Sequence, residues 1–343
     1  MIVTNLRSSS ITTFKGCPMA WFLEYNLGWD GGSNKAAIKG TVVHAVLELL
    51  ACIKKADQEG QKTITTDMGI SRLKVKDYLS TTRLLDKLTC RLYDIHTKKY
   101  PQLKWKDVDQ KDCIKWVCKT LDGWGGQFDP RSRNIIEPEM FFDIEIVKPW
   151  SAYKYTLPDG TKLQGFFSIK GTIDVVTELD KNTIEVVDYK SGRYRKDWNT
   201  GEEKTIEYIR NEIQPRMYHY VLGQKYPDKQ VMVTMLYINA GGPFSVYYDH
   251  SDIAKTEKII KKYYQEIKKA KPHCVKTWKC SKMCEYGKTD FSDTLVTPLI
   301  RDDRYLTKCA QMEYVLQHKT VEDAMKHMCC GELTKNLDRY NQG

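Results

Sequence analysis

Two apolar segments on either side of a short polar turn place the strongest constraint on the fold of this chain. The segments are FFSIKGTIDVV (residues 166–176) and TIEVVDYKSG (residues 183–192). Both are rich in β-branched residues, and the stretch 179–183 between them has the composition of a turn, so they predict a β-hairpin. If the loop is symmetric about Lys181, Asp174 and Asp188 face each other across the strands with Cβ atoms about 5 Å apart.

The charged residues at the end of this hairpin predict chemistry. Facing carboxylates destabilise a strand pair unless a positive group lies between them. The two-residue period of a strand places Lys190 on the same face as Asp188, and this face begins with the apolar Ile184 and Val186. Two carboxylates and a lysine on one sheet face suit metal-assisted phosphodiester cleavage. A solvated Asp–Lys ladder is the alternative, although it explains only Asp188 and Lys190.

The composition is that of an ordinary globular protein with an excess of positive charge. The 343 residues, 41% hydrophobic and 29% charged, suffice for one large domain or two small ones. The net charge of +10 favours a polyanionic partner such as DNA. Lysines are concentrated toward the C-terminal part, where the solvated face of a helix and a DNA track are both open interpretations. These lysines are Lys261, Lys262, Lys268, Lys269, Lys271, Lys276, Lys279 and Lys282.

The sequence predicts a cytoplasmic protein without a membrane partner. We find no apolar stretch that approaches the roughly 18–20 residues of a membrane span. The first residues, MIVTNLR, lack the layout of a secretory signal. In a reducing cytosol the 11 cysteines are expected to be buried thiols or metal ligands rather than disulfides.

The order of predicted elements indicates an α/β fold. We expect a small mixed sheet flanked by helices, with helical insertions and a C-terminal helical segment. Strands are predicted within 136–190 and at 230–239 and 244–249. Helices are predicted at 10–30, 40–55, 206–226 and 252–270, in most of 67–125, and beyond 302, where Thr320 to Asp323 form a capping box.

Two further pairs of polar residues are spaced to share a helix face. His44 and Glu48 are four residues apart, and imidazole and carboxylate groups suit Mn²⁺ or Mg²⁺, although a surface pair has the same spacing. Gln214 and Tyr218 have this spacing too, and Pro215 fits a first helical turn. The amide and the phenol could bind a phosphate or a base, or they could form an ordinary polar stripe.

Four cysteines form the last set. Cys274, Cys280 and Cys284 lie within eleven residues, His273 is adjacent, and Cys17 is distant in sequence. Clustered thiols with a distant fourth suit zinc or an iron–sulfur cluster. Gaps of five and three residues do not match a zinc ribbon.

In their order, these motifs resemble those of the RecB-type branch of the PD-(D/E)XK nucleases. The chain is most similar to the stand-alone iron–sulfur exonucleases associated with CRISPR loci and phages. The matching residues are Ser10, Phe14, Cys17 and Pro18; Gly40, His44 and Glu48; Gly171 and Asp174; Asp188, Tyr189, Lys190, Ser191 and Gly192; and Gln214 and Tyr218. The resemblance implies a restriction-endonuclease-like core.

The resemblance also implies roles for these residues. The divalent cation, Mg²⁺ or Mn²⁺, would be held by His44, Asp174, Asp188 and the carbonyl of Tyr189. Lys190 would orient or help to deprotonate the attacking water and stabilise charge on the phosphate, and Gln214 and Tyr218 would position the DNA strand.

The cysteines depart from the family pattern. Related enzymes end with a cysteine after a five-residue gap, where this chain has Asp290. We therefore expect the set Cys17, Cys274, Cys280 and Cys284. It would hold a structural [4Fe–4S] cluster, with zinc as the alternative.

The sequence thus predicts a metal-dependent DNA exonuclease acting on single strands or duplex ends in recombination, replication or repair. We expect a phage-encoded protein or one of the bacterial host cytoplasm, with a separate helicase or recombination protein as partner. The nuclease domain would span 1–300, with a helical insertion at 67–125 and the cysteine cluster at 274–284, and 301–343 would be a helical extension. The alternative is a non-catalytic DNA-binding or clamp subunit of a recombination complex. An ATPase in this chain is excluded, because Lys282 stands where a phosphate-binding loop needs glycine.

Overall fold

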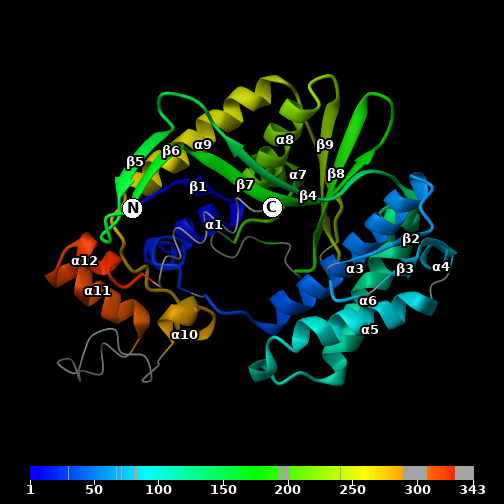
Figure 1. The fold of residues 1–343 in the computed structure, drawn as a ribbon, viewed down its shortest axis with the longest axis horizontal. Helices are drawn as coiled ribbons and strands as arrows, with labels where there is room; N and C mark the ends of the chain where they lie inside the picture. The colour runs from blue at the N-terminus through cyan, green and yellow to red at the C-terminus, as the bar shows by residue number, and fades with distance from the viewer. Residues whose placement is uncertain are drawn as a thin grey trace. The chain divides into compact units, whose positions relative to one another are not determined.

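A computed structural model describes most of the chain, and Figure 1 shows its ribbon. The described residues are 1–29, 31–66, 68–70, 72–80, 83–192, 196, 201–239, 241–288 and 307–328. They form two compact units. Unit 1 comprises Met1–Gly32, Phe142–Gly171 and Glu257–Gly343, and unit 2 comprises Ser33–Phe141 and Thr172–Thr256. The predicted domain boundary near residue 300 lies outside the described residues.

A mixed sheet forms the centre of unit 2. Its strands are most of β4 (Asn134–Glu145) and most of β7 (Ser168–Glu178), together with β8 (Thr183–Lys190), β9 (Gln230–Tyr237) and β10 (Phe244–Tyr248). β8 pairs antiparallel with β7 and parallel with β9, β9 pairs antiparallel with β10, and β4 pairs with β7. Every residue of β8 from Thr183 to Tyr189 is buried, as expected for a central strand covered on both faces. The predicted hairpin, mixed sheet and α/β class are confirmed.

Helices cover one face of this sheet. They are α3 (Lys35–Gln58), α4 (Val75–Ser80), α5 (Arg83–Thr97) and α6 (Asp107–Asp122), with the short hairpin β2 (Thr63–Ile64) and β3 (Leu73–Lys74). α3, α5 and α6 share an apolar core with Val175, Val187 and Tyr189 of the sheet (Figure 1). Short 3₁₀ turns follow at η2 (Pro101–Leu103), η3 (Gly123–Gly126) and η4 (Pro130–Ser132). The prediction of a mostly helical 67–125 region therefore holds.

α3 combines high hydropathy with a position in the core. By length and composition alone it could cross a membrane, so the expectation that no stretch approaches this length was wrong. However, 61% of its apolar window is buried inside the protein. The side chain of Asn34 caps the helix by accepting a hydrogen bond from the backbone N–H of Ala37 at 3.0 Å. Packing in unit 2 therefore accounts for the apolar sequence.

The predicted helix 206–226 is two helices, α7 (Ile206–Asn211) and α8 (Ile213–Lys225). The break lies at Glu212, whose φ of −65° and ψ of 147° are extended. Thr205 caps α7 by accepting from the backbone N–H of Tyr208 at 3.1 Å. Pro215 lies in the first turn of α8, where its missing N–H has no helical partner to lose. The break lets α8 pack against β9 independently of α7.

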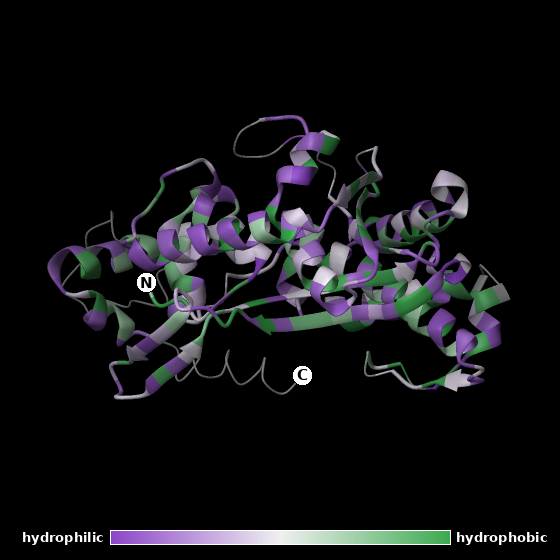
Figure 2. Ribbon diagram, turned by 90° about the horizontal axis from the view of Figure 1, so that it is seen from above, coloured by the Kyte–Doolittle hydropathy of each residue, from purple (hydrophilic) through white to green (hydrophobic). Residues whose placement is uncertain are grey.

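Unit 1 gathers both ends of the described chain. Its elements are β1 (Asn5–Leu6), α1 (Ser8–Gly16), α2 (Pro18–Trp21), the π-helix η1 (Phe22–Asn26), β5 (Ala152–Thr156), β6 (Lys162–Phe166), most of α9 (Ser251–Lys269), α10 (Lys279–Lys282), η5 (Glu285–Gly287), α11 (Lys308–His318) and α12 (Val321–Met325). Phe22, Leu23 and Met312 are fully buried in its apolar cluster. Figure 2 shows how green hydrophobic and purple hydrophilic positions alternate along the helices. The predicted capping box at Thr320 is confirmed.

Candidate active site

The two aspartates of the hairpin lie where its backbone ladder ends. Each pair of the β7–β8 ladder is symmetric about Lys181, and the last pair is Val175 with Val187. The next position along the ladder pairs Asp174 with Asp188. The predicted register is therefore present, and it brings both acids to the end of the paired segment.

The carboxylate of Asp174 contacts both the neighbouring strand β8 and the helix α3. Its Oδ2 accepts a hydrogen bond from the backbone N–H of Tyr189 at 2.8 Å. Its Oδ1 lies 3.2 Å from Nδ1 of His44. The His44 ring also meets the ring of Tyr189 edge-on, at 6.4 Å between centroids. The sheet and α3 thus hold one carboxylate and one imidazole together.

The carboxylate of Asp188 is fixed by the first turns of α8. Its Oδ1 accepts hydrogen bonds from the Tyr218 hydroxyl at 2.8 Å and from Nε2 of Gln214 at 3.1 Å. Gln214 Nε2 also lies 2.6 Å from the Tyr218 hydroxyl, which is 3.0 Å from the carbonyl oxygen of Thr172. A phenol carries one proton, so the Tyr218 hydroxyl shares it between two acceptors. The predicted i, i+4 pair therefore meets the predicted aspartate.

Lys190 completes the cluster on the second oxygen of Asp188. The Nζ of Lys190 is 2.6 Å from Oδ2 of Asp188. This buried oxygen has no hydrogen bond of good geometry among the described residues. The Asp188 side chain is 3% exposed, whereas those of Asp174, Lys190 and His44 are 21%, 29% and 34% exposed. The cluster is therefore closed behind Asp188 and open to solvent beside the other three residues.

Burial and mutual contacts move the pKa values of the two acids in opposite directions. Burial raises the pKa of Asp188 and the charge of Asp174 adds to this, although Lys190 opposes it. Burial also acts upward on Asp174, but the charge and hydrogen bond of His44 outweigh it and lower the pKa of Asp174. Paired carboxyl groups with separated pKa values are typical of catalytic sites.

The neighbouring acids raise the pKa values of the two bases. Burial disfavours the charged form of His44, but Asp174 outweighs it and raises the pKa of His44. Burial acts the same way on Lys190, whose pKa is nevertheless raised by Asp188 and Asp174. The two acids thus favour the charged forms of both neighbouring bases.

The cluster suits Mg²⁺ or Mn²⁺ by its donor chemistry. Mg²⁺ binds to one or two carboxylates and keeps several waters, so Asp174 and Asp188 suffice as protein anchors. The Oδ2 of Asp188 is a buried oxygen available to a cation. Among the described residues, no group of three or more His, Cys, Asp or Glu side chains is arranged to hold an ion. Such an ion would therefore depend on water or backbone oxygens as well.

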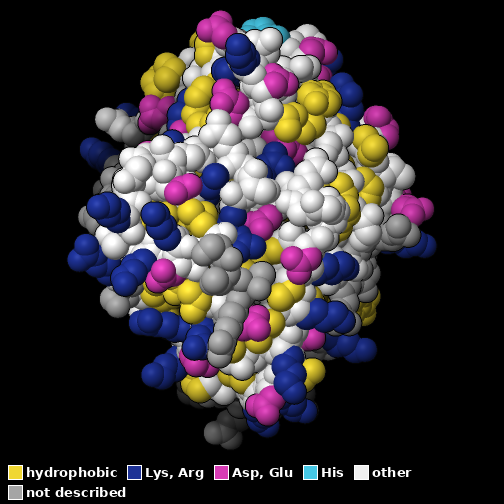
Figure 3. Space-filling model, turned by 90° about the vertical axis from the view of Figure 1, so that its right-hand side faces the viewer, with side chains coloured by type: hydrophobic (Ala, Val, Ile, Leu, Met, Phe, Trp, Pro, Cys, Tyr) yellow, Lys and Arg dark blue, Asp and Glu magenta, His cyan; other side chains and the backbone are white. Residues whose placement is uncertain are grey.

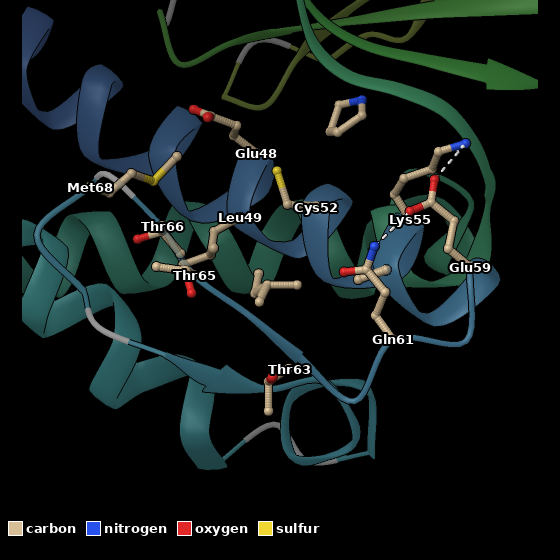
Figure 4. Close-up of a pocket in the computed structure, with 13 residues that line it drawn as sticks. Glu48, Leu49, Cys52, Lys55, Glu59, Gln61, Thr63, Thr65, Thr66 and Met68 are labelled. Carbon is tan, nitrogen blue, oxygen red and sulfur yellow. Dashed lines mark hydrogen bonds and ion pairs between the residues drawn. The ribbon is translucent and has the colours of Figure 1, made fainter.

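Glu48 lies apart from these contacts, one helical turn beyond His44. It lines a cavity of about 630 Å³ between α3 and the β2–β3 segment (Figure 4). Other polar residues of this cavity include Gln61, Thr63 and Thr66. His44 and Glu48 therefore share a helix face but have different surroundings. His44 contacts the Asp174 carboxylate, whereas Glu48 lines the cavity.

The four predicted cysteine ligands lie in unit 1. The Sγ of Cys17 is 3.9 Å from the carbonyl oxygen of His273. Burial raises the pKa of the Cys284 thiol, and nearby Cys280 and Cys17 add smaller effects. The Sγ of Cys280 turns to its own loop, where it accepts from the backbone N–H of Thr277 at 3.4 Å.

Cys274 has a different neighbour, which the sequence did not single out. Its Sγ is 2.8 Å from that of Cys309, in the first turn of α11. The hydrogen bond to Cys309 and burial raise the pKa of Cys274 well above its usual range. A [4Fe–4S] or structural zinc centre needs a set of thiolates supplied together. The described cysteines form no such set, so they do not fit the predicted centre.

Sequence reasoning missed Cys309 and the carbonyl of Thr172. Cys309 stands alone in sequence, 35 positions from Cys274, so no spacing pattern marks it. The Thr172 carbonyl is a backbone group, which a side-chain motif cannot show. Both became visible only through the packing of α11 and α8.

Comparison with known proteins gives a family match over most of the chain. The family model described as "PD-(D/E)XK nuclease superfamily" matches residues 7–289. No curated protein matches the chain. Among solved structures, it is similar to a protein named "Putative exonuclease" from Eubacterium rectale, with 10% identity, a TM-score of 0.45, and coverage of 81% of this chain and 86% of that chain. It is also similar to SSO0001, with 14% identity, a TM-score of 0.28, and coverage of 70% and 93%.

Proposed function

Because the chain belongs to the PD-(D/E)XK nuclease superfamily, we propose that it is a divalent-metal-dependent deoxyribonuclease that digests DNA from its ends. The superfamily and the restriction-endonuclease-like fold, both expected from the sequence, are confirmed. The proposed substrate is single-stranded DNA or a duplex end in bacterial recombination, replication or repair. The observation that carries the proposal is the cluster of Asp174, Asp188 and Lys190 at the open end of one hairpin.

Mg²⁺ or Mn²⁺ is the expected cofactor, with His44, Asp174, Asp188 and the Tyr189 carbonyl as its proposed ligands. When bound, such a cation lowers the pKa of water and offsets charge on the phosphate.

Lys190 is the proposed electrostatic catalyst. Its raised pKa keeps the ammonium protonated, so it serves as a cation and hydrogen-bond donor toward the phosphate rather than as a base. Its side chain is partly exposed, which lets it turn between Asp188 and a substrate.

Gln214 and Tyr218 are proposed to orient Asp188. Tyr218 is 3% exposed and both side chains donate toward the same carboxylate oxygen. With this oxygen fixed, the other oxygen of Asp188 faces Lys190. The DNA-positioning role expected from the resemblance stays a prediction for this pair.

The proposed DNA contact draws on charges beyond the cluster. On the face drawn in Figure 3, Lys and Arg side chains are interspersed with Asp and Glu rather than gathered in one basic patch. Of the C-terminal lysines, Lys262, Lys268 and Lys269 of α9 are exposed. Scattered charges of this kind would bind DNA without sequence preference. The affinity for DNA would fall as the salt concentration rises.

The test uses end-labelled and circular DNA, single- and double-stranded, with Mn²⁺, Mg²⁺ or chelator. We expect linear DNA to be shortened from its ends with metal, and circular DNA to resist. Asp188→Asn and Lys190→Met should each lower the rate by about 10²–10³-fold, while DNA binding remains. Asp180→Asn, in the exposed turn of the same hairpin, is the matched control.

Two results would decide against this proposal. Undiminished cleavage by Asp188→Asn would remove the cluster from the chemistry. DNA binding by the wild-type protein without cleavage under any metal condition would favour the clamp subunit instead. A separate helicase or recombination protein remains the proposed partner in either case.

A further inference from the structure

Cys274 and Cys309 form a close thiol pair in unit 1. Their Sγ atoms are 2.8 Å apart although the residues are 35 positions apart in sequence. Both side chains are partly buried and pack against the same apolar cluster, which includes Met312 and Val315 of α11. The contact therefore comes from tertiary packing and not from a local turn.

This pairing competes with the thiol centre that the sequence predicts. A four-thiolate centre needs Cys274 to converge with Cys17, Cys280 and Cys284. Instead, Cys274 faces Cys309, and Cys280 turns to Thr277 and Val275 of its own loop. No group of three such donors is found among the described residues. The observed contact therefore favours a reaction between two thiols over a centre with four thiolate ligands.

We propose that Cys274 and Cys309 form a reversible intramolecular disulfide. The oxidant is a small disulfide of the glutathione class. Because the pKa of Cys274 is raised, Cys309 is the attacking thiolate: it binds one sulfur of this disulfide and releases one reduced thiol, and Cys274 then loses its proton and displaces the other. Two protein thiols lose two electrons, the oxidant becomes two thiols, and these carry away both protons. Partial exposure of the pair gives a small oxidant access.

The bond would fasten α11 to the segment that follows α9. Cys309 is the second residue of α11, and Cys274 lies between α9 and α10. The segment around Cys274 already contacts α2 through a hydrogen bond from the Met19 backbone N–H to the His273 carbonyl oxygen at 3.1 Å. Oxidation would therefore tie the C-terminal helices to the N-terminal part of unit 1. The proposal does not depend on nuclease activity.

The test is a thiol map of the full-length protein before and after oxidised glutathione. We expect the intact mass to lose two hydrogens and alkylation of Cys274 and Cys309 to be lost together, and dithiothreitol to restore both. Peptide mapping without reduction should give one cross-linked pair. Cys309→Ser should abolish this product, whereas Cys280→Ser, the matched control, should leave it unchanged.

Three outcomes would overturn the proposal. One is a cross-link from Cys274 to Cys280 or Cys284, and another is full alkylation of Cys274 and Cys309 after oxidation. The third is stoichiometric zinc, or iron with sulfide, in the purified protein that is lost in Cys274→Ser or Cys309→Ser. If Cys309→Ser fails to fold, the wild-type peptide map alone decides between these results.

Discussion

A close approach explains why the hairpin strand β7 carries glycine at position 171. A Cβ on Gly171 would lie 2.6 Å from Cζ and 2.9 Å from Cε1 of Phe142. The φ of Gly171 is outside the left-handed region, so the backbone conformation would accept a side chain. The obstacle is the steric clash with the Phe142 ring. Phe142 is 4% exposed and has no open space to swing into. We therefore predict that Gly171→Ala destabilises the protein.

The magnitude follows from two opposing effects. Forcing one methyl into a well-packed site costs about 1–3 kcal/mol, and the rigid buried ring favours the upper end. Replacing glycine by alanine in a strand also stabilises the protein by about 0.5–1 kcal/mol, because the unfolded chain has less conformational entropy to lose on folding. The net expectation is a loss of about 2 kcal/mol in the free energy of unfolding. Because Asp174 lies three residues along the same strand, cleavage should fall as well.

The assay is urea denaturation of the full-length protein, followed by tryptophan fluorescence. Phe142→Leu makes room for the methyl, so Gly171→Ala with Phe142→Leu should be more stable than the sum of the single changes by about 1 kcal/mol. Gly192→Ala is the matched control, since its Cβ would meet nothing within 4 Å. A Gly171→Ala protein as stable as the wild type, or strictly additive effects, would refute the steric argument.

Three further predictions concern buried polar groups. Tyr218→Phe should lower the free energy of unfolding by about 2 kcal/mol through the lost bond to Asp188, and the loss should shrink in an Asp188→Asn background in a urea double-mutant cycle. Burial lowers the pKa of His219 to about 4 from 6.5, so the folded state resists protonation, and stability should fall by about 2–3 kcal/mol as pH drops from 6.5 toward 4. Denaturation curves measured across this pH range should show that His219→Gln loses this pH dependence of stability. An unchanged pH dependence would mean that another group causes it. Arg133→Met strands the buried carboxylate of Glu185 and should cost about 3–5 kcal/mol, with Glu185→Gln recovering part of it; equal stability of Arg133→Met and wild type would contradict the pairing.

The hairpin and its acids could be predicted because local rules suffice there. Alternating β-branched residues and the turn-like stretch at 179–183 set the register, and the register alone places Asp174 beside Asp188. The i, i+4 spacing likewise placed Gln214 beside Tyr218. Spacing could not show that both side chains donate hydrogen bonds to Asp188, because this contact depends on how α8 packs against the sheet.

Features that depend on distant packing escaped prediction. Pro215 was expected in a first helical turn, but no residue at the break itself, the extended Glu212, showed that α7 ends before this position and α8 begins after it. The apolar run of α3 is long enough for a membrane, and only the helices packed around it explain its composition. The neighbour of Cys274 lies beyond the reach of any spacing rule. The predicted domain limits stay a prediction.

The asymmetry between the two aspartates follows from where the hairpin ladder ends. One oxygen of Asp174 accepts a hydrogen bond from the Tyr189 backbone N–H, and the other lies 3.2 Å from Nδ1 of His44. The Tyr218 hydroxyl of α8 fixes one oxygen of Asp188, and Nζ of Lys190 lies 2.6 Å from the other. Asp174 and Asp188 would hold a divalent cation, which would offset charge on the phosphate, and the Lys190 ammonium would donate a hydrogen bond to the same anion. His44 and Lys190, the two partly exposed bases beside the acids, are thus well placed to meet an anionic substrate.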